Sequence, residues 1–169
     1  MSDFTEKLAF GEEGEKVVME YLLNQGRICL PMYQFNPKTA PKIMTPYGEV
    51  TSPDFITIHG RNRTIYAESK RKKMWVTSYN HDTERETGID NRHFKAYCQL
   101  VKVTGTPLEL YFIHEEMDPK GLYRIVLKEV MIDEWVKERR HFRFDYMITQ
   151  GGKNTPMIFF PYEMLEKIY

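Results

Sequence analysis

Residues 52–75 read SPDFITIHGRNRTIYAESKRKKMW, and the fold prediction starts from them. Apolar side chains recur in 52–59 and in 64–70, which indicates two short strands, and the Gly-Arg-Asn sequence between them has the composition of a tight turn. A hairpin centred on the middle residue of that turn pairs Asp54 directly with Glu68. Directly paired residues share one face of a sheet, with Cβ atoms roughly 4.5–5.5 Å apart. The stretch therefore predicts two carboxylates side by side on one hairpin.

A positive charge is expected between these carboxylates, because like charges placed opposite each other destabilise a sheet. Lys70 is one candidate, since side chains alternate along a strand and Lys70 shares a face with Glu68. A divalent metal is the other candidate, because a cation such as Mg²⁺ is typically held by one or two carboxylates, with water and substrate phosphate completing its shell. The residues alone leave both candidates open.

The hairpin resembles the PD-(D/E)XK motif of the restriction-endonuclease-like nuclease superfamily, with Pro53-Asp54 followed by Glu68-Ser69-Lys70. Within that superfamily it is most similar to Holliday-junction-resolvase-like and recombinational-repair-type nucleases. The resemblance implies an α/β fold, in which helices flank a central mixed sheet of four to five strands in the order helix, strand, hairpin, helix, strand. It covers about 5–114 of a single nuclease domain spanning 1–169, with 115–169 as peripheral strands and helices.

The same resemblance implies metal-dependent hydrolysis of DNA phosphodiester bonds, in repair, recombination or phage DNA processing. Asp54, Glu68 and the backbone carbonyl of Ser69 would hold one or two Mg²⁺ or Mn²⁺ ions, which generate the hydroxide nucleophile. Lys70 would orient the attacking water and stabilise charge on the phosphate. Two other classes compete with this interpretation. One is a non-catalytic nucleic-acid-binding or assembly subunit, and the other is a structural domain with ordinary surface carboxylates.

A long helix is predicted over 5–24, with Gly26 as its stop. One face of it carries, at steps of three and four residues, Leu8, Gly11, Glu15, Val18 and Leu22. Glu15 is the exception in this apolar stripe. A buried carboxylate must be paired or bind a metal, whereas at the edge of the stripe it would reach solvent. Superfamily members often open with a helix carrying Gly-x-x-x-Glu, so the resemblance implies Glu15 as a further catalytic residue and metal ligand.

Positive charge is concentrated around the second strand of the hairpin, with a net charge of +5 over 61–73. A solvated basic edge strand is one interpretation, since lysine is common at such edges. The resemblance implies instead that DNA phosphates are held by Arg61, Arg63, Arg71, Lys72 and Lys73. Trp75, which follows them, could stack on a base or pack in the core.

A second helix is predicted from an N-cap at Asp90 to about residue 103, closed by Gly105. Its polar stripe is either a solvated face or part of a DNA-binding surface. In the superfamily the helix after the Glu-x-Lys strand flanks the active site. The resemblance therefore adds four candidate DNA contacts: His93, Lys95, Tyr97 and Gln99.

The remaining elements follow from hydrophobic periodicity and from turn residues. Strands are predicted at 27–32, 108–114, 122–127 and 157–160, and further helices at 128–139 and 161–168. The proline-rich stretch of about twenty residues that follows the strand at 27–32, and the aperiodic segment 76–87, are predicted to be loops.

The composition bounds the class of protein more than its function. The 169 residues have a net charge of zero and a pI near 7.0, so the overall charge gives no support to nucleic-acid binding. No apolar run is long enough for a membrane span, no signal peptide is recognisable, and the two cysteines lie far apart. We therefore expect a cytoplasmic protein that does not bind a membrane, and DNA as its partner is what the resemblance implies. The sequence leaves a homodimer open.

Overall fold

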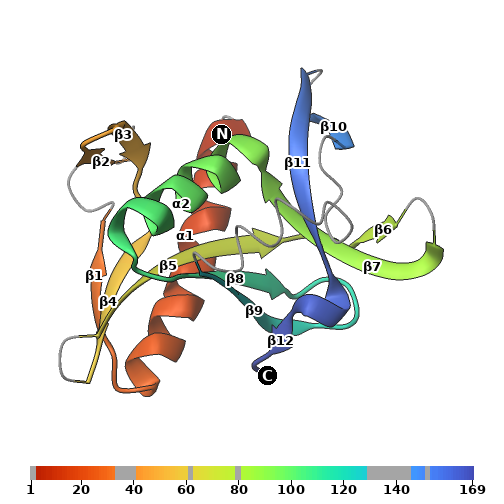
Figure 1. Ribbon diagram of the computed structural model, residues 1–169. Helices are drawn as coiled ribbons and strands as arrows, with labels where there is room; N and C mark the ends of the chain where they lie inside the picture. Colours follow the sequence, from red (N-terminus) through yellow and green to blue (C-terminus); the bar gives the residue numbers. More distant parts are fainter. Residues whose placement is uncertain (1–2, 33–40, 61–62, 79–80, 129–145, 151–152) are drawn as a thin grey trace.

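The computed structural model describes residues 3–32, 41–60, 63–78, 81–128, 146–150 and 153–169 (Figure 1). Its main sheet contains, in spatial order, β1 (Ile28–Pro31), β4 (Phe55–His59), β5 (Arg63–Lys72), β8 (Leu108–His114), β9 (Gly121–Leu127) and β12 (Glu166–Lys167). Neighbouring strands are antiparallel except for β5 and β8, which are parallel. The predicted α/β class with a mixed sheet is confirmed, but the sheet has six strands rather than four or five.

Two helices cover opposite faces of this sheet: α1 (Asp3–Asn24) lies behind it and α2 (Asn91–Thr104) in front of it in Figure 1. The α1 face is closed by Val18 and Leu22, which pack with Ala67, Tyr111, Ile113 and Leu122. On the α2 face the helix contributes Phe94, Tyr97, Leu100 and Val101, which pack with Leu108, Leu110 and Phe112. None of the helices in the described part of the chain is long and apolar enough to cross a membrane.

The predicted hairpin register is confirmed. Phe55 pairs with Ala67, and His59 pairs with Arg63, which continues directly to Asp54 opposite Glu68. The pairing ends at Phe55, so β5 runs on beyond β4 from Glu68 to Lys72. This part of β5 is paired instead with β8 on its other side. The register therefore places the two carboxylates at the point where β4 begins.

Helix α1 forms where it was predicted and stops before Gly26, whose φ of 72° suits glycine. Its predicted buried stripe is only partly correct, because Leu8 is 39% exposed and Gly11 has no neighbour for an added Cβ. Gly14 is the small residue that contacts the sheet. A Cβ there would lie 3.0 Å from Arg71 Cβ and 3.3 Å from Ser69 Oγ. Glycine at this position lets α1 approach β5 closely.

The two glycines of α1 give a matched pair of substitutions. Alanine is favoured over glycine in a helix by roughly 0.5–1 kcal/mol, so Gly11→Ala should raise the free energy of unfolding by about that amount. Gly14→Ala should lower it by about 1 kcal/mol, because Arg71 Cβ is fixed to the β5 backbone and cannot swing away. Urea unfolding of both variants measures the difference. Equal stabilisation by the two substitutions would show that α1 does not depend on this close approach.

Helix α2 also forms as predicted, with both ends capped. Asp90 Oδ1 accepts a hydrogen bond of 2.7 Å from the Arg92 backbone N–H. Gly105 has φ 64° and donates to the Val101 carbonyl. The strands predicted at 108–114 and 122–127 are confirmed as β8 and β9, and the strand predicted at 157–160 lies within β11.

Three local predictions are wrong. The second half of the proline-rich segment forms a hairpin of β2 (Lys42–Thr45) and β3 (Gly48–Thr51), with Pro46 in its turn. The predicted loop 76–87 contains β6 (Val76–Ser78) and most of β7 (His81–Asp90), and these two strands pair with each other in antiparallel orientation. The supposed helix 161–168 consists of a 3₁₀ turn, η2 (Tyr162–Met164), followed by β12, because β12 pairs with β9. The helix predicted at 128–139 falls almost wholly outside the described residues, as does 33–40 of the predicted loop.

A second, antiparallel sheet extends from the main one (Figure 1). Its order is β10 (Tyr146–Gln150), β11 (Lys153–Pro161), β7, β6. Ile89 of β7 and Ile158 and Phe160 of β11 are buried in the same core cluster as α2. This sheet therefore supports α2 at the end where the helix begins.

Candidate active site

The two carboxylates of the hairpin are buried and hydrogen-bonded across the two strands. The Asp54 backbone N–H donates to Glu68 Oε2 at 3.0 Å, and the Ser69 backbone N–H donates to Asp54 Oδ2 at 2.8 Å. Each side chain thus accepts a backbone hydrogen bond from the opposite chain segment, at the point where the β4–β5 ladder ends. The predicted proximity of Asp54 and Glu68 is present in the structure.

Lys70 places a positive charge beside these carboxylates. Its ammonium forms an ion pair with Glu68 Oε1, and its side chain is only partly exposed. The Ser69 hydroxyl lies instead on the α1 face, next to Gly14. The Ser69 side chain is therefore not on the carboxylate side of β5.

Glu15 of α1 belongs electrostatically to the same cluster. Burial raises the pKa of Glu15, Glu68 raises it further, and Lys70 opposes the shift. The side chain is half-buried, so it is neither the fully buried nor the fully solvated residue that the sequence allowed. The contact of Gly14 with β5 brings this part of α1 to the sheet.

The surroundings of Asp54 disfavour its charged form. Burial first and Glu68 second raise the pKa of Asp54 well above its ordinary value of 3.8, and Lys70 only partly opposes this shift. The folded protein therefore retains this proton at pH values where the unfolded chain has released it. The contribution of Asp54 to stability falls as the pH rises from 3.8 through the raised pKa.

The direction of the Asp54 pKa shift predicts how the stability of the protein depends on pH. Asp54→Asn removes the titration, so the stability of the variant relative to wild type should increase as the pH rises from about 4 to 8. Urea unfolding of both proteins across this range measures the difference, in which the titrations of other groups largely cancel. A difference that does not change with pH would contradict the raised pKa.

The beginning of α2 lies beside this cluster, as the resemblance implies. Burial lowers the pKa of His93, and the next largest influence is the charge of Lys70, with Glu68 acting in the opposite direction. His93 is therefore neutral at pH 7. Lys95 is exposed and Gln99 is half-buried. Tyr97 is 1% exposed and packs in the core, so its side chain is not accessible to DNA in this structure.

The predicted basic residues divide between the two faces of β5. Arg71 lies on the α1 face, where its guanidinium pairs with Glu13 and Glu115 and stacks 4.3 Å from the Phe10 ring centroid. This arrangement makes Arg71 a clamp between α1 and the end of β8, rather than a ready ligand for phosphate. Lys72 faces the other way, because it alternates with Arg71 along the strand.

Burial and neighbouring Lys70 lower the pKa of Lys72 to about 8. Lys73 is exposed, with Nζ 5.4 Å from the Phe10 ring centroid. Arg63 is exposed at the start of β5, and Arg61 lies outside the described residues. Lys72, the last residue of β5, and Lys73, which follows it on the side of Phe10, are therefore the described basic residues of this set that come after the cluster and are not held in an ion pair between α1 and β8.

Trp75 is a packing residue in this structure. It is buried, stacks on His114 with ring centroids 3.7 Å apart, and donates to the Pro119 carbonyl. Burial lowers the pKa of His114 to about 4, so this imidazole is neutral at pH 7. The apolar context of His114 in β8 gave no indication of this stack.

Sequence reasoning also missed a buried ionic network on the α1 face. Glu109 of β8 pairs with Arg27 at 2.5 Å and with Arg124 at 3.2 Å, and it accepts a hydrogen bond of 2.7 Å from the Tyr111 hydroxyl. Arg124 also pairs with exposed Glu166. A single acid within the apolar 108–114 run was the available signal. The network joins β8, β9 and β12 to the chain after α1.

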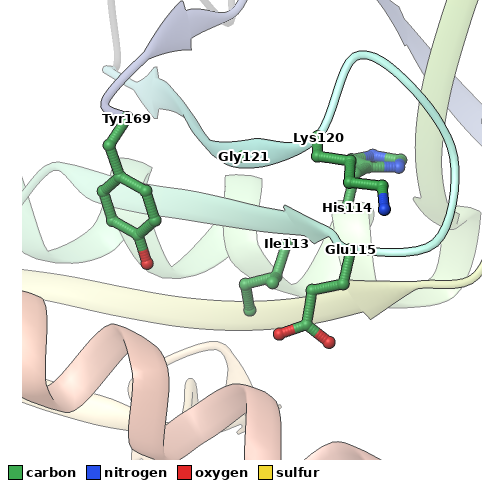
Figure 2. Close-up of a pocket in the computed structure, with 6 residues that line it drawn as sticks. All are labelled: Ile113, His114, Glu115, Lys120, Gly121 and Tyr169. Carbon is green, nitrogen blue, oxygen red and sulfur yellow. The ribbon is translucent and has the colours of Figure 1, made fainter.

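Figure 2 shows a pocket of about 360 Å³ elsewhere on the protein. It is lined by Ile113, His114, Glu115, Lys120, Gly121 and Tyr169. Ile113 and Glu115 point toward α1 in this view, and Glu115 is the partner of Arg71. The lining includes none of the carboxylates of the Asp54 cluster, so the pocket and the candidate active site are separate features.

Within the described residues, no group of three or more His, Cys, Asp and Glu side chains is arranged to hold a metal ion. Comparison of the chain with family models, with curated proteins and with solved structures finds no match. The functional argument therefore rests on the geometry of the cluster formed by Glu15, Asp54, Glu68 and Lys70.

Proposed function

We propose that this protein is a metal-dependent nuclease of the PD-(D/E)XK type, which hydrolyses phosphodiester bonds in DNA. One observation carries the proposal: the β4–β5 register brings Asp54, Glu68 and Lys70 together. These are the residues of the motif, and α1 adds Glu15 to them. A restriction-endonuclease-like core belongs to the same proposal.

The charge of the cluster fits a divalent cation. The cluster contains three carboxylates and one ammonium, so it has two excess negative charges when all of its groups are ionised. Burial first and the neighbouring carboxylate charge second raise the pKa values of Asp54 and Glu15. Carboxylate and carbonyl oxygens are the donors that Mg²⁺ and Mn²⁺ prefer. Asp54, Glu68, Glu15 and the Ser69 carbonyl would hold the ion, and the carboxylates would have to move closer together to do so, because their present arrangement is not that of a metal site. A bound ion would activate water and neutralise charge on phosphate.

The chain's own side chains would position the substrate. The Lys70 ammonium is oriented by Glu68 and can donate to a phosphate oxygen or to the attacking water. Neutral His93, beside Lys70, can donate one hydrogen bond and accept another. Phosphates along the DNA strand would be contacted, without readout of the base sequence, by Lys72, Lys73, Arg63 and Lys95.

Cleavage of labelled DNA tests this proposal. Single-stranded, duplex and branched substrates are incubated with the wild-type protein in Mg²⁺, in Mn²⁺ or in EDTA. We expect cleavage of at least one substrate in the presence of a divalent ion and none in EDTA. Metal-independent cleavage, or no cleavage of any substrate, would reject a metal-dependent nuclease.

A non-catalytic nucleic-acid-binding subunit is the second candidate. It is favoured because each carboxylate already accepts a backbone hydrogen bond. Carboxylates that only stabilise the hairpin would have the same contacts. This candidate predicts DNA binding that weakens as salt increases and that does not change in Asp54→Asn. The nuclease proposal predicts instead that the same substitution abolishes metal-dependent DNA cleavage.

A further inference from the structure

The two-residue turn of the β2–β3 hairpin is closed by side-chain hydrogen bonds. The Thr45 hydroxyl accepts a hydrogen bond from the Tyr47 N–H at 3.2 Å and donates to the Gly48 carbonyl at 2.6 Å. Gly48 has φ 114°, a conformation that glycine adopts without strain. The base of the hairpin is closed by the hydrogen bond from Ser52 N–H to the Pro41 carbonyl.

One side of this hairpin is anchored and the other is open. Val50 is buried in the α2 core, and Ile43, its partner across the hairpin, packs against that core. Tyr47 is 79% exposed and Met44 is 72% exposed, which makes them the two most exposed large apolar side chains in the described part of the chain. Lys42 shares the outward face with Met44 and is also exposed. The outward side of the hairpin thus presents the ring of Tyr47, the thioether of Met44, the ammonium of Lys42 and the carboxylate of Glu49, which pairs with Met44.

The hairpin leads directly into the candidate active site. Figure 1 shows β3 running down toward the start of β4, where Asp54 lies. Tyr47 precedes Asp54 by seven residues, so their Cα atoms are at most about 25 Å apart. Stacked nucleotides are spaced at roughly 3.4 Å along one strand. A strand at the carboxylates therefore needs no more than about seven nucleotides to reach the hairpin tip.

An exposed aromatic ring close to a phosphodiester site matches the chemistry of an unpaired base. Proteins hold single strands by stacking aromatic side chains on bases, with cations beside the backbone. The faces of bases inside a duplex are already covered by their neighbours, so a protruding ring can stack only on an unpaired or terminal base. Tyr47 supplies the ring at the tip, and Lys42 supplies a positive charge at the base of the same hairpin.

We propose that Tyr47 stacks on an unpaired nucleobase within about seven nucleotides of the bond at the carboxylate cluster. This inference rests on the proposed nuclease function and specifies its substrate class. The substrate is nucleic acid with single-stranded character, such as a single strand, a frayed end or a branch, rather than continuous duplex.

Binding measured in EDTA tests the inference independently of cleavage. The probes are a single-stranded oligonucleotide containing 2-aminopurine and a closed DNA hairpin whose stem is continuous duplex. We compare wild type with Tyr47→Ala, Tyr47→Phe and Tyr169→Ala. The last is a matched control, because Tyr169 is 61% exposed and lies away from the hairpin in Figure 1.

We expect Tyr47→Ala to weaken binding of the single strand by about 5- to 100-fold, the range for loss of one base stack. Tyr47→Phe and Tyr169→Ala should bind within about twofold of wild type, and quenching of 2-aminopurine should be lost only in Tyr47→Ala. Equal single-strand affinity in Tyr47→Ala and wild type would overturn the inference. So would a wild-type protein that binds duplex but no single strand, or that binds neither.

These outcomes are separable from failure of the nuclease proposal. If wild type cleaves DNA while Tyr47→Ala binds single strands normally, the nuclease stands and the stacking role falls. If wild type binds single strands through Tyr47 but never cleaves with Mg²⁺ or Mn²⁺, the stacking role stands and the nuclease falls. A protein partner at the hairpin would appear as a Tyr47-dependent interaction without nucleobase quenching, which contradicts stacking.

Discussion

Asp54→Asn is expected to abolish metal-dependent DNA cleavage, with a loss of about three orders of magnitude or more. The substitution removes one of the carboxylates that would hold the ion, and metal assistance stabilises the transition state by several kcal/mol. The asparagine keeps an oxygen that can accept from the Ser69 N–H, so the backbone contact survives. Cleavage rates of wild type and variant, at equal protein concentration and saturating Mg²⁺, measure the loss.

Stability measurements separate a lost active site from a lost fold. Asp54 is buried beside Glu68, so its neutralisation should leave the melting temperature at pH 7 unchanged or higher. Asp118→Asn is the matched control, because it makes the same change at an exposed position and should cleave at the wild-type rate. If Asp54→Asn is folded and still cleaves within about tenfold of wild type, Asp54 has no role in catalysis.

The largest expected loss of stability is at Glu109. Glu109→Ala leaves the guanidinium groups of Arg27 and Arg124 partly buried without their shared partner. Removing one side of a buried ion pair costs about 3–5 kcal/mol, so much of the stability of a domain of this size is at risk. Urea unfolding monitored by circular dichroism measures the change.

Glu166→Ala provides the comparison for Glu109. It removes the other carboxylate partner of Arg124, but Glu166 is exposed, so the cost should be less than about 1 kcal/mol. Similar costs for the two substitutions would mean that the network does not depend on burial. A Glu109→Ala protein as stable as wild type would show that the network contributes nothing to the fold.

The hairpin register could be predicted because its determinants are local. A short turn fixes the pairing of two adjacent strands, and the spacing of Asp54 and Glu68 then follows. Helix α2 was predictable for the same reason, since Asp90 and Gly105 cap it from its own ends. These two elements position most of the candidate site.

The missed strands depend on partners that are distant in sequence. β7 pairs with β11, in a register that joins Gly88 to Phe159, and its own sequence shows no apolar alternation. The prolines near β2 suggested a loop, although Pro46 lies in the turn and is compatible with the hairpin. β12 exists because it pairs with β9. Local patterns do not contain these long-range contacts.

The side-chain roles that were missed have the same origin. Arg71 lies within a basic run that suggested phosphate binding, but its partners Glu13 and Glu115 come from α1 and from the end of β8. Glu109 pairs with Arg27, which lies 82 residues earlier in the chain. Tyr97 lies one turn from His93 and was grouped with it, although its side chain turns into the core. Charge and spacing identified candidates, and only the packing decided their contacts.

Binding of Mn²⁺ to the intact protein tests most directly whether the Asp54 cluster is a metal centre. Electron paramagnetic resonance of free Mn²⁺ is recorded during titration with wild type, Asp54→Asn and Asp118→Asn. The structure leads us to expect that wild type and Asp118→Asn bind Mn²⁺ competitively with Mg²⁺, and that Asp54→Asn loses this binding. Equal binding by Asp54→Asn and wild type, or no binding by wild type, would contradict a metal-dependent active site at these carboxylates.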